Sequence, residues 1–310
     1  MLLEVDAATY YKFFPVNPHS FISDPFINLN KSKTEKIIYL IANPEKPSVG
    51  LVTGMKNRIL LSHFSAPFGG FHFRNEIVYI SDLDFFLKSL NNYMVENDLS
   101  GIDIVLPPDI YHQTFNSKIS SSLLRNEFHA NVPEITNWVD LHRFSGEFSQ
   151  KNSREYYRQA LRNNLVFEKA EDLNDKIKIY NLIKSNREKF GRPIYMSFDD
   201  VIQTGNLWPV DFFKVSVSNS LVASAIFYRN HSEIVYATFW GDNEEGRPLR
   251  AMDFLSYNLW QYYKNQGFHY IDLGISTESG IPNEGLLRFK ESHDAVSSLK
   301  YKFSRRINPK

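Results

Sequence analysis

The last third of the chain has the most regular pattern of hydrophobic and polar positions. Three apolar runs are separated by short polar turns at Asn219-Ser220 and Asn230-His231. Runs of this length and spacing predict strands joined in an antiparallel meander. The runs cover residues 212–217, 221–228 and 233–240.

A helix, a strand, a second helix and a final strand are predicted after the meander. Apolar residues recur at helical spacing over residues 248–266, with Pro248 near the start. Residues 270–274 indicate a buried strand, and Asn283 is suited to cap a short helix. Apolar and polar residues then alternate over residues 299–303. The predicted order is β-β-β-α-β-α-β.

The first half shows a less regular version of the same order, which suggests a duplication at the level of the fold. An apolar stripe at helical spacing predicts a helix over residues 82–97, with Asp82 as its cap. A shorter helix is predicted over residues 109–117. The predicted strands, the second of which is divided by a hairpin turn, cover residues 37–42, 49–61, 102–106 and 138–142.

The middle of the chain is predicted to be helical. Asn152 and Glu155 have the spacing of a capping box, which indicates a helix through about residue 164. A longer helix is predicted over residues 173–190, and Gly191 is suited to end it. Together these elements predict an α/β protein with mixed sheets. We expect two domains, residues 1–150 and residues 151–310.

Charge and composition exclude several function classes. The chain has 35 Lys and Arg against 35 Asp and Glu, so it lacks the positive field of a protein that coats DNA. It contains no cysteine, which excludes disulfides, thiolate metal sites and a cysteine nucleophile. Its 9 histidines lack metal-ligand spacing, and HExxH, P-loop and nucleophile-elbow motifs are absent. A metal enzyme or a serine hydrolase is therefore disfavoured.

The chain shows no targeting or membrane signal. Glu4 and Asp6 interrupt the apolar N-terminal sequence before a signal-peptide core forms. The longest apolar runs have the length of strands and are too short to span a bilayer. We expect a cytoplasmic protein without a membrane span.

Four local motifs accompany the predicted β-β-β-α-β-α-β order. They are APFGGF at residues 66–71; SREYYRQALR at 153–162, with Arg187 and Gly191-Arg192 after it; ATFWG at 237–241; and IDLG at 271–274 followed by GLLRFK at 285–290. In this order and spacing they resemble the FemAB-like branch of the GNAT N-acyltransferase superfamily. Its best-known enzymes pair two GNAT-type domains and move amino acids from aminoacyl-tRNA onto peptidoglycan precursors.

The resemblance implies a bacterial N-acyltransferase with two GNAT-like domains. It would transfer an acyl or aminoacyl group to an amine by direct attack, without a covalent enzyme intermediate. The donor is either an acyl-CoA or an aminoacyl-tRNA, and the acceptor is a small-molecule amine or a cell-wall precursor. No cofactor would be permanently bound. The alternative is a non-catalytic protein on the same scaffold that binds a small ligand or a partner.

The donor site follows from the two central strands, which diverge in GNAT folds and free main-chain groups for a ligand. The turn before the next helix would hold phosphate groups at the helix N-terminus. Here that turn has Arg250 where the family has glycine, which counts against CoA. The predicted donor-binding residues are Trp240, Gly241, Arg247, Arg250, Ala251 and Gly274.

Two residues are predicted to be catalytic. Lys290 matches a lysine that FemAB-like enzymes place near the reacting carbonyl, where it would stabilise the tetrahedral intermediate. Asp272 is the preferred base, with Glu233 as a second candidate. Each also has a structural interpretation: a lysine near a helix C-terminus, and a carboxylate bonded to backbone amides. Residues 283–295 lack the tyrosine that many acetyltransferases use as acid, which favours the non-catalytic alternative.

A third group of residues is predicted to bind the acceptor or a phosphate. Three arginines recur at i, i+4 and i+8 and form a basic face that either meets phosphates or is simply solvated. The Pro- and Gly-containing loop before residue 71 either lines an acceptor pocket or forms a rigid turn. The set is Phe68, Gly69, Gly70, Arg154, Arg158, Arg162 and Arg192.

Overall fold

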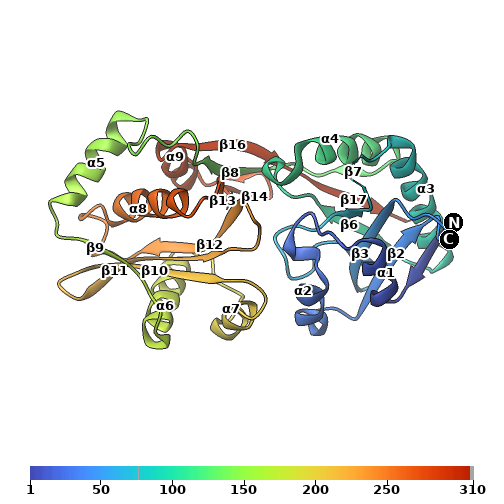
Figure 1. The fold of residues 1–310 in the computed structure, drawn as a ribbon, viewed down its shortest axis with the longest axis horizontal. Coiled ribbons are helices and arrows are strands. Elements are labelled where there is room, and N and C mark those ends of the chain that lie inside the picture. The colour runs from blue at the N-terminus through green and yellow to red at the C-terminus, as the bar shows by residue number, and fades with distance from the viewer. Residues whose placement is uncertain (76, 308–310) are drawn as a thin grey trace. The chain divides into compact units, whose positions relative to one another are not determined.

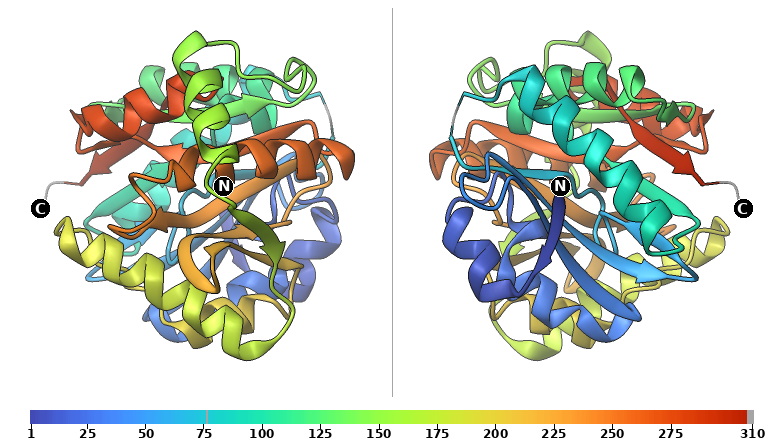
Figure 2. Two further views of the ribbon diagram at one scale, coloured as in Figure 1. Left: turned by 90° about the vertical axis from the view of Figure 1, so that its left-hand side faces the viewer. Right: turned by 90° about the vertical axis from the view of Figure 1, so that its right-hand side faces the viewer.

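The computed structural model describes residues 1–75 and 77–307 and divides the chain into two compact units. The first comprises residues 1–134 and the segment from Ser298 onward, and the second comprises Ile135–Ser297. Each unit is a mixed α/β layer structure with helices on both faces of its sheet (Figures 1 and 2). In the described residues, no helix has the length and hydrophobicity needed to cross a bilayer.

The first unit has the strand order β1-β2-β3-β4-β6-β17-β7, and β5 pairs with β3. Helices α3 and α4 cover one face, and α1 and α2 the other (Figures 1 and 2). The elements are β1 (Leu2–Val5), α1 (Ala7–Phe13), α2 (Asp24–Leu29), β2 (Lys36–Ala42), β3 (Val49–Lys56), β4 (Ile59–Leu61), β5 (Phe71–Phe73), α3 (Ile80–Glu96), β6 (Gly101–Val105), α4 (Asp109–Arg125), β7 (His129–Ala130) and β17 (Lys302–Arg306).

The second unit has the strand order β16-β8-β13-β12-β11-β10-β9. Helices α5 and α8 cover one face of this sheet, and α6 and α7 the other (Figures 1 and 2). The elements are β8 (Glu134–Asp140), α5 (Lys151–Leu161), β9 (Val166–Lys169), α6 (Leu173–Lys189), α7 (Phe198–Thr204), β10 (Val210–Val217), β11 (Ser220–Tyr228), β12 (Ile234–Asp242), α8 (Ala251–Asn265), β13 (Tyr270–Ile275), the hairpin β14 (Thr277–Glu278) and β15 (Ile281–Pro282), α9 (Glu284–Ser292) and β16 (Ala295–Lys300).

The two central strands of the second sheet diverge, as predicted. β12 and β13 run parallel and pair only at Ile234↔Tyr270, Val235↔Ile271 and Tyr236↔Asp272. Beyond that point β12 remains paired with β11 as far as Asp242, whereas β13 pairs with β8. The free edges of β12 and β13 therefore face each other without a ladder between them. The backbone N–H and C=O groups released there are available to other partners.

A β-bulge in β12 decides which side chains flank this opening. Ile226 pairs with Phe239 and Phe227 with Ala237, so Thr238 is an extra residue on β12. As a result, Ala237 and Trp240 both pack with the hydrophobic cluster on the α8 side. Phe239 lies on the opposite face, under the guanidinium of Arg187 from α6.

The first unit contains the same parallel pair, but there the divergence is closed. β4 and β6 pair from Ile59↔Gly101 to Leu61↔Asp103. The following loop then returns to β6: the Ser62 hydroxyl accepts from the Val105 amide at 3.3 Å, and the Gly69 amide donates to the Val105 carbonyl at 2.9 Å. A Cβ on Gly69 would lie 1.7 Å from the Ser62 carbonyl oxygen, so the loop is tightly folded on itself.

The element boundaries differ from the sequence predictions in four places. Helix α5 has Gln150 as N-cap and no side-chain capping bond, so the predicted capping box of Asn152 and Glu155 was wrong. Helix α8 begins at Ala251, since Pro248 belongs to a turn in which the Ala251 amide bonds to the Gly246 carbonyl. Helix α4 is longer than predicted, running over Asp109–Arg125.

The fourth difference concerns the division of the chain. The compact units separate near residue 134, whereas the sequence predicted a boundary at 150. The predicted last strand of the C-terminal domain continues as β17, which pairs with β6 and β7 in the first sheet. The end of the chain therefore belongs to the first unit because β17 pairs with strands that lie far away in sequence. Local sequence patterns contain no information about such pairing.

Candidate functional site

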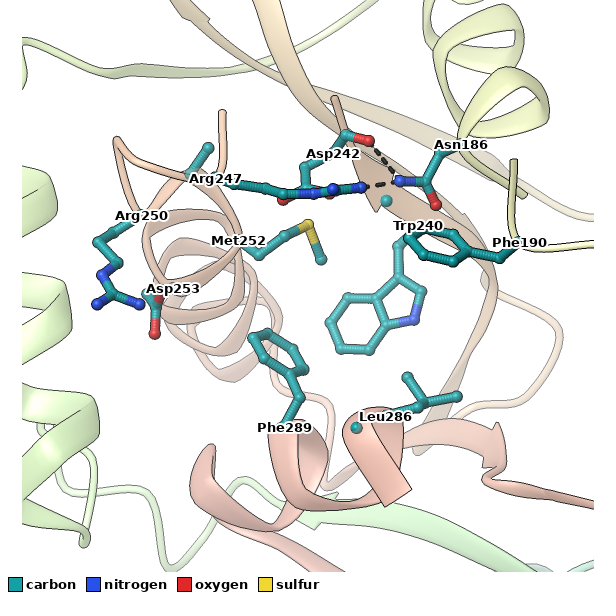
Figure 3. A pocket seen from close by; sticks show the side chains of 13 residues that line it. Asn186, Phe190, Trp240, Asp242, Arg247, Arg250, Met252, Asp253, Leu286 and Phe289 are labelled. Carbon is teal, nitrogen blue, oxygen red and sulfur yellow. Dashed lines mark hydrogen bonds and ion pairs between the residues drawn. The ribbon is translucent and has the colours of Figure 1, made fainter. Parts of the chain in front are cut away.

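A cavity of about 430 Å³ opens beside the free end of β12 in the second unit. It lies among β12, the last turns of α6, the first turn of α8, and α9 (Figure 3). Its lining residues are Asn186, Phe190, Trp240, Gly241, Asp242, Arg247, Arg250, Ala251, Met252, Asp253, Gly285, Leu286 and Phe289.

The floor of the cavity is apolar. The rings of Trp240 and Phe289 have their centroids 5.7 Å apart, and the side chains of Met252 and Leu286 face the same space (Figure 3). Asn283 caps α9 by accepting from the Leu286 amide, as predicted, and this cap fixes the start of the helix that carries Phe289. The floor therefore suits an uncharged portion of a ligand.

The rim of the cavity is polar and charged. Arg247 lies beside Asp242, with Nε 3.7 Å from Oδ1, and over the ring of Phe190 at 5.4 Å (Figure 3). The Asn186 amide donates to the Asp242 carbonyl and ties α6 to the end of β12. Burial raises the pKa of the Asp242 carboxyl, although the neighbouring Arg247 opposes this.

Arg250 occupies the residue that precedes α8 and adopts the left-handed conformation, with φ of 59°. This conformation favours glycine over residues that carry a Cβ. The arginine side chain points away from the cavity floor, and its guanidinium lies 3.8 Å from the centroid of the Tyr156 ring on α5 (Figure 3). This stacking offsets part of the cost of the left-handed backbone.

A buried polar cluster lies where β12 and β13 separate. The Lys290 side chain on α9 is 1% exposed, and its Nζ donates to the carbonyls of Gly274 and Ile275 at 2.9 and 3.0 Å. Asp272 is equally buried, and its Oδ1 accepts from the Gly274 amide at 2.8 Å. Burial lowers the pKa of Lys290 to about 7, although the charge of Asp272 opposes the shift.

Tyr236 completes this cluster from β12. It is paired in register with Asp272, and a Cβ on Gly274 would lie 3.8 Å from the tyrosine hydroxyl. Gly274 has φ of 68°, so the strand turns at this point in a conformation that glycine adopts without strain. Burial and the nearby Asp272 raise the pKa of Tyr236, so its hydroxyl stays protonated and can donate a hydrogen bond.

A second buried pair joins α8 to α9 below the cavity. His293 Nδ1 lies 2.7 Å from the Phe289 carbonyl oxygen, and its Nε2 lies 3.1 Å from Asp253 Oδ1. A carbonyl oxygen only accepts, so Nδ1 carries a proton. The pair links the first turn of α8 to the end of α9 and stabilises two walls of the cavity. In the part of the chain that the structure describes, no group of three or more side chains could hold a metal ion.

Solved structures share this fold over nearly the whole chain. The crystal structure of FemX covers 99% of this chain and 98% of its own, with a TM-score of 0.67 at 12% identity. L-PGS from Bacillus licheniformis covers 99% and 94%, with a TM-score of 0.58 at 13% identity. A tandem GNAT protein from the clavulanic acid biosynthesis pathway covers 100% and 99%, with a TM-score of 0.58 at 7% identity.

The fold is GNAT-like and FemAB-like. The predicted fold class, an α/β protein built from two GNAT-like parts, is confirmed. No family model and no curated protein matches the sequence. At these identities the likeness concerns the fold alone.

The FemAB-like fold brings most of the predicted donor residues to one cavity. Trp240, Gly241, Arg247, Arg250 and Ala251 all line it. Gly274, the sixth, lies at the buried cluster, where its carbonyl accepts from Lys290.

The predicted acceptor and phosphate residues are dispersed. Phe68 is 1% exposed, and its ring packs against His19, Phe21 and Tyr111, so it has no free surface for a ligand. Gly69 and Gly70 belong to the same closed loop of the first unit, and both are buried.

The arginines of the same predicted set have different surroundings. Arg154 donates to the carbonyls of Phe148 and Ser149 and holds the chain before α5. Arg158 is exposed on α5, and Arg162 is exposed at the C-cap of that helix. Arg192 lies in the loop after α6, where its carbonyl accepts from Arg187.

Sequence reasoning missed several residues of the site, chiefly Tyr236, Asn186 and Phe289. Tyr236 and Phe289 occur within apolar runs, where aromatic residues usually serve packing. Asn186 comes from α6, and the Asp242 carbonyl to which it donates lies 56 residues further along the chain. Only the pairing of β12 with β13 and the position of α6 on the sheet reveal their common location.

Proposed function

We propose that this protein is an N-acyltransferase, in which a donor occupies the cavity beside β12 and its acyl group reaches the polar cluster between β12 and β13. The observation that carries the proposal is the divergence of these strands after Tyr236↔Asp272, with a cavity at one side and buried Lys290 at the other. Catalysis by positioning needs such a preformed site.

The cavity supports a donor with an apolar arm and an anionic carrier. The floor formed by Trp240, Met252 and Phe289 would bind the arm. In the described residues, the Met252 and Asp253 amides in the first turn of α8 have no hydrogen-bond partner and would attract an anion, whereas the Ala251 amide is already bonded to the Gly246 carbonyl. Arg247 at the rim adds positive charge. An acyl-CoA and an aminoacyl-tRNA both have this chemistry, and acyl-CoA is the commoner donor among GNAT proteins.

The transfer would proceed by direct attack of an amine on the donor carbonyl. A C–N bond forms, the carbonyl oxygen becomes an oxyanion, and collapse of the intermediate breaks the bond from the carbonyl carbon to the carrier sulfur or oxygen. The proton lost by the amine balances the proton gained by the leaving group. Hydrogen-bond donors directed at the oxyanion supply most of the rate acceleration in such sites.

Three residues have roles in this proposal. A protonated Lys290 has three N–H groups, of which two are used by the Gly274 and Ile275 carbonyls, so the third is available to the oxyanion. The Tyr236 hydroxyl would protonate the leaving group. Asp272 holds the Gly274 amide and acts as a positioning residue, in place of the base predicted from sequence.

The proposal is tested by incubating the protein with acetyl-CoA or with aminoacyl-tRNA and a panel of amines, and by detecting the N-acyl product by mass spectrometry. We expect product with one donor class and stabilisation of the protein by that donor against heat. The non-catalytic alternative predicts thermal stabilisation without product. Neither stabilisation nor product at millimolar donor would rule out the proposed function.

A further inference from the structure

A second cavity, of about 1090 Å³, lies in the first unit. Its walls come from the chain between α1 and α2, from residues 73–75 at the end of β5, from residues 77 and 79 before α3, and from the start of α4. The donor cavity has the corresponding position in the second unit, because α8 and α9 follow the parallel strands β12 and β13 as α3 and α4 follow β4 and β6. A cavity of this size is at the upper end of the range for small-molecule sites.

The wall that comes from residues 16–18 is held in place by two buried histidines. His72 is fully buried, and its Nε2 lies 2.8 Å from Asn17 Oδ1. His19 follows directly in the chain, and its Nε2 donates to the Gly69 carbonyl at 2.9 Å. Both bonds fasten this segment to the core of the first unit, so the wall is preformed.

The opposite wall is aromatic and joins α4 to the segment before α3. Lys118 Nζ donates to the Val78 carbonyl at 2.8 Å and connects the two. The backbone of His112 is non-helical, and its ring is stacked on that of Phe115 with the centroids 3.6 Å apart. The Phe115 ring also contacts Phe73 at the end of β5, at 4.6 Å. Three rings therefore form one surface in the lining of the cavity.

Other apolar side chains of the lining are exposed to solvent. Val16 is 73% exposed, Ile77 69% and Tyr79 66%. Single exposed apolar side chains are normal on a protein surface, but three of them around one concave, aromatic-lined space favour a site that a ligand covers. Covering this surface contributes about 25 cal/mol per Å² of apolar area removed from water.

Arg74 determines the charge of the cavity. Among the described residues that line it, Arg74 is the only Lys, Arg, Asp or Glu, so the lining has one positive charge on an otherwise apolar or uncharged surface. The site differs from the donor site in one respect: the loop of residues 62–70 occupies the Val105 amide and carbonyl beyond the parallel pair. The cavity is therefore suited to binding without acyl transfer.

We propose that this cavity binds a small organic anion with an apolar body. The body packs against the rings of Phe73, Phe115 and Tyr79, and the acidic group pairs with the Arg74 guanidinium. This ligand site goes beyond the proposed function and does not depend on it, because every residue that forms it belongs to the first unit.

A titration with the fluorescent probe 8-anilinonaphthalene-1-sulfonate, itself an apolar anion, tests the site directly. Thr114→Trp fills the cavity from an exposed position on α4, and Arg74→Gln removes the charge. We expect each variant to weaken probe binding by about tenfold or more, through lost space and a lost charge-assisted hydrogen bond respectively. The matched controls, which should bind the probe as the wild type does, are Leu124→Trp at an exposed position of the same helix and Arg143→Gln in the second unit.

Displacement of the probe by matched acids and alcohols identifies the class of ligand. Octanoate and octanol share an alkyl body, 2-naphthoate and 2-naphthol share an aromatic one, and the members of each pair differ in charge. In the wild type we expect each acid to displace the probe at a concentration at least about tenfold lower than its alcohol, and Arg74→Gln to reduce that ratio to about threefold or less. The acid that displaces the probe better distinguishes an aromatic body from an alkyl one.

Three results would overturn the inference: equal probe affinity in Thr114→Trp and Leu124→Trp, equal displacement by acid and alcohol in the wild type, or loss of probe binding in Met252→Trp, which would place the probe in the donor cavity. Should Thr114→Trp fail to fold, the displacement ratio in Arg74→Gln decides, because that substitution changes only an exposed side chain. Acyl transfer is measured in neither experiment, so failure of the proposed function would leave both readouts intact.

Discussion

Replacing Lys290 with methionine is expected to lower turnover by about 100- to 1000-fold, which is the usual effect of removing one oxyanion donor. Methionine has a similar length and fills the buried site, but it cannot donate to the Gly274 and Ile275 carbonyls or to the oxyanion. Donor affinity should change by less than about threefold, because Lys290 is not among the residues that line the cavity. Steady-state kinetics with separate donor titration measure both quantities.

The pH dependence of stability provides the control for this variant. The pKa of Lys290 is about 7 in the folded chain and above 10 when unfolded, so between these values the unfolded chain binds more protons. Wild-type unfolding free energy should therefore rise with pH relative to Lys290→Met, on the order of 2 kcal/mol from pH 7 to 9. Turnover equal to that of the exposed-site control Lys184→Met would contradict the proposed role.

Gly69→Ala is expected to destabilise the first unit by about 4 kcal/mol or more, beyond the range of ordinary substitutions. The added Cβ would lie 1.7 Å from the Ser62 carbonyl oxygen, a backbone atom that cannot move without breaking the pairing of the loop with β6. This loop closes the strand divergence of the first unit, so the variant tests how much that closure contributes to the stability of the unit. Chemical denaturation followed by amide hydrogen exchange in β4 and β6 measures it, because the four tryptophans of the chain all lie in the second unit.

Gly285→Ala is the matched control. A Cβ at Gly285 meets only Asn283 Oδ1 at 3.8 Å, and alanine favours the helix that begins there. We expect no loss of stability in this variant. If Gly69→Ala were as stable as Gly285→Ala, the loop of residues 62–70 would not be closed as described.

Local patterns predicted the elements well where periodicity and turn residues agree. The meander β10–β11–β12 was predicted from alternating apolar runs, and Asn283 was correctly assigned as the cap of α9. The errors occur where tertiary bonds override local signals. The α8 start is set by the bond from the Ala251 amide to the Gly246 carbonyl, and β17 is placed by pairing with β6, far away in sequence.

The candidate site was predictable only where a motif coincides with the strand ends. Trp240 and Gly241, which were predicted to bind the donor, lie near the end of β12 and line the cavity. For the loop that contains Phe68 the sequence left two interpretations open, a pocket lining and a rigid turn, and the side chain is buried in the structure. An aromatic residue in a Pro- and Gly-containing loop has the same sequence pattern whether it lines a pocket or fills a core.

The measurement that tests the central claim most directly is a calorimetric titration of acetyl-CoA and of aminoacyl-tRNA into the wild type and Met252→Trp. The Met252 side chain faces the cavity, so tryptophan there should fill donor space and weaken binding by at least about tenfold, whereas Leu161→Trp on the exposed face of α5 should not. The account predicts one donor molecule per chain. Two bound donors, or unchanged affinity in Met252→Trp, would contradict it.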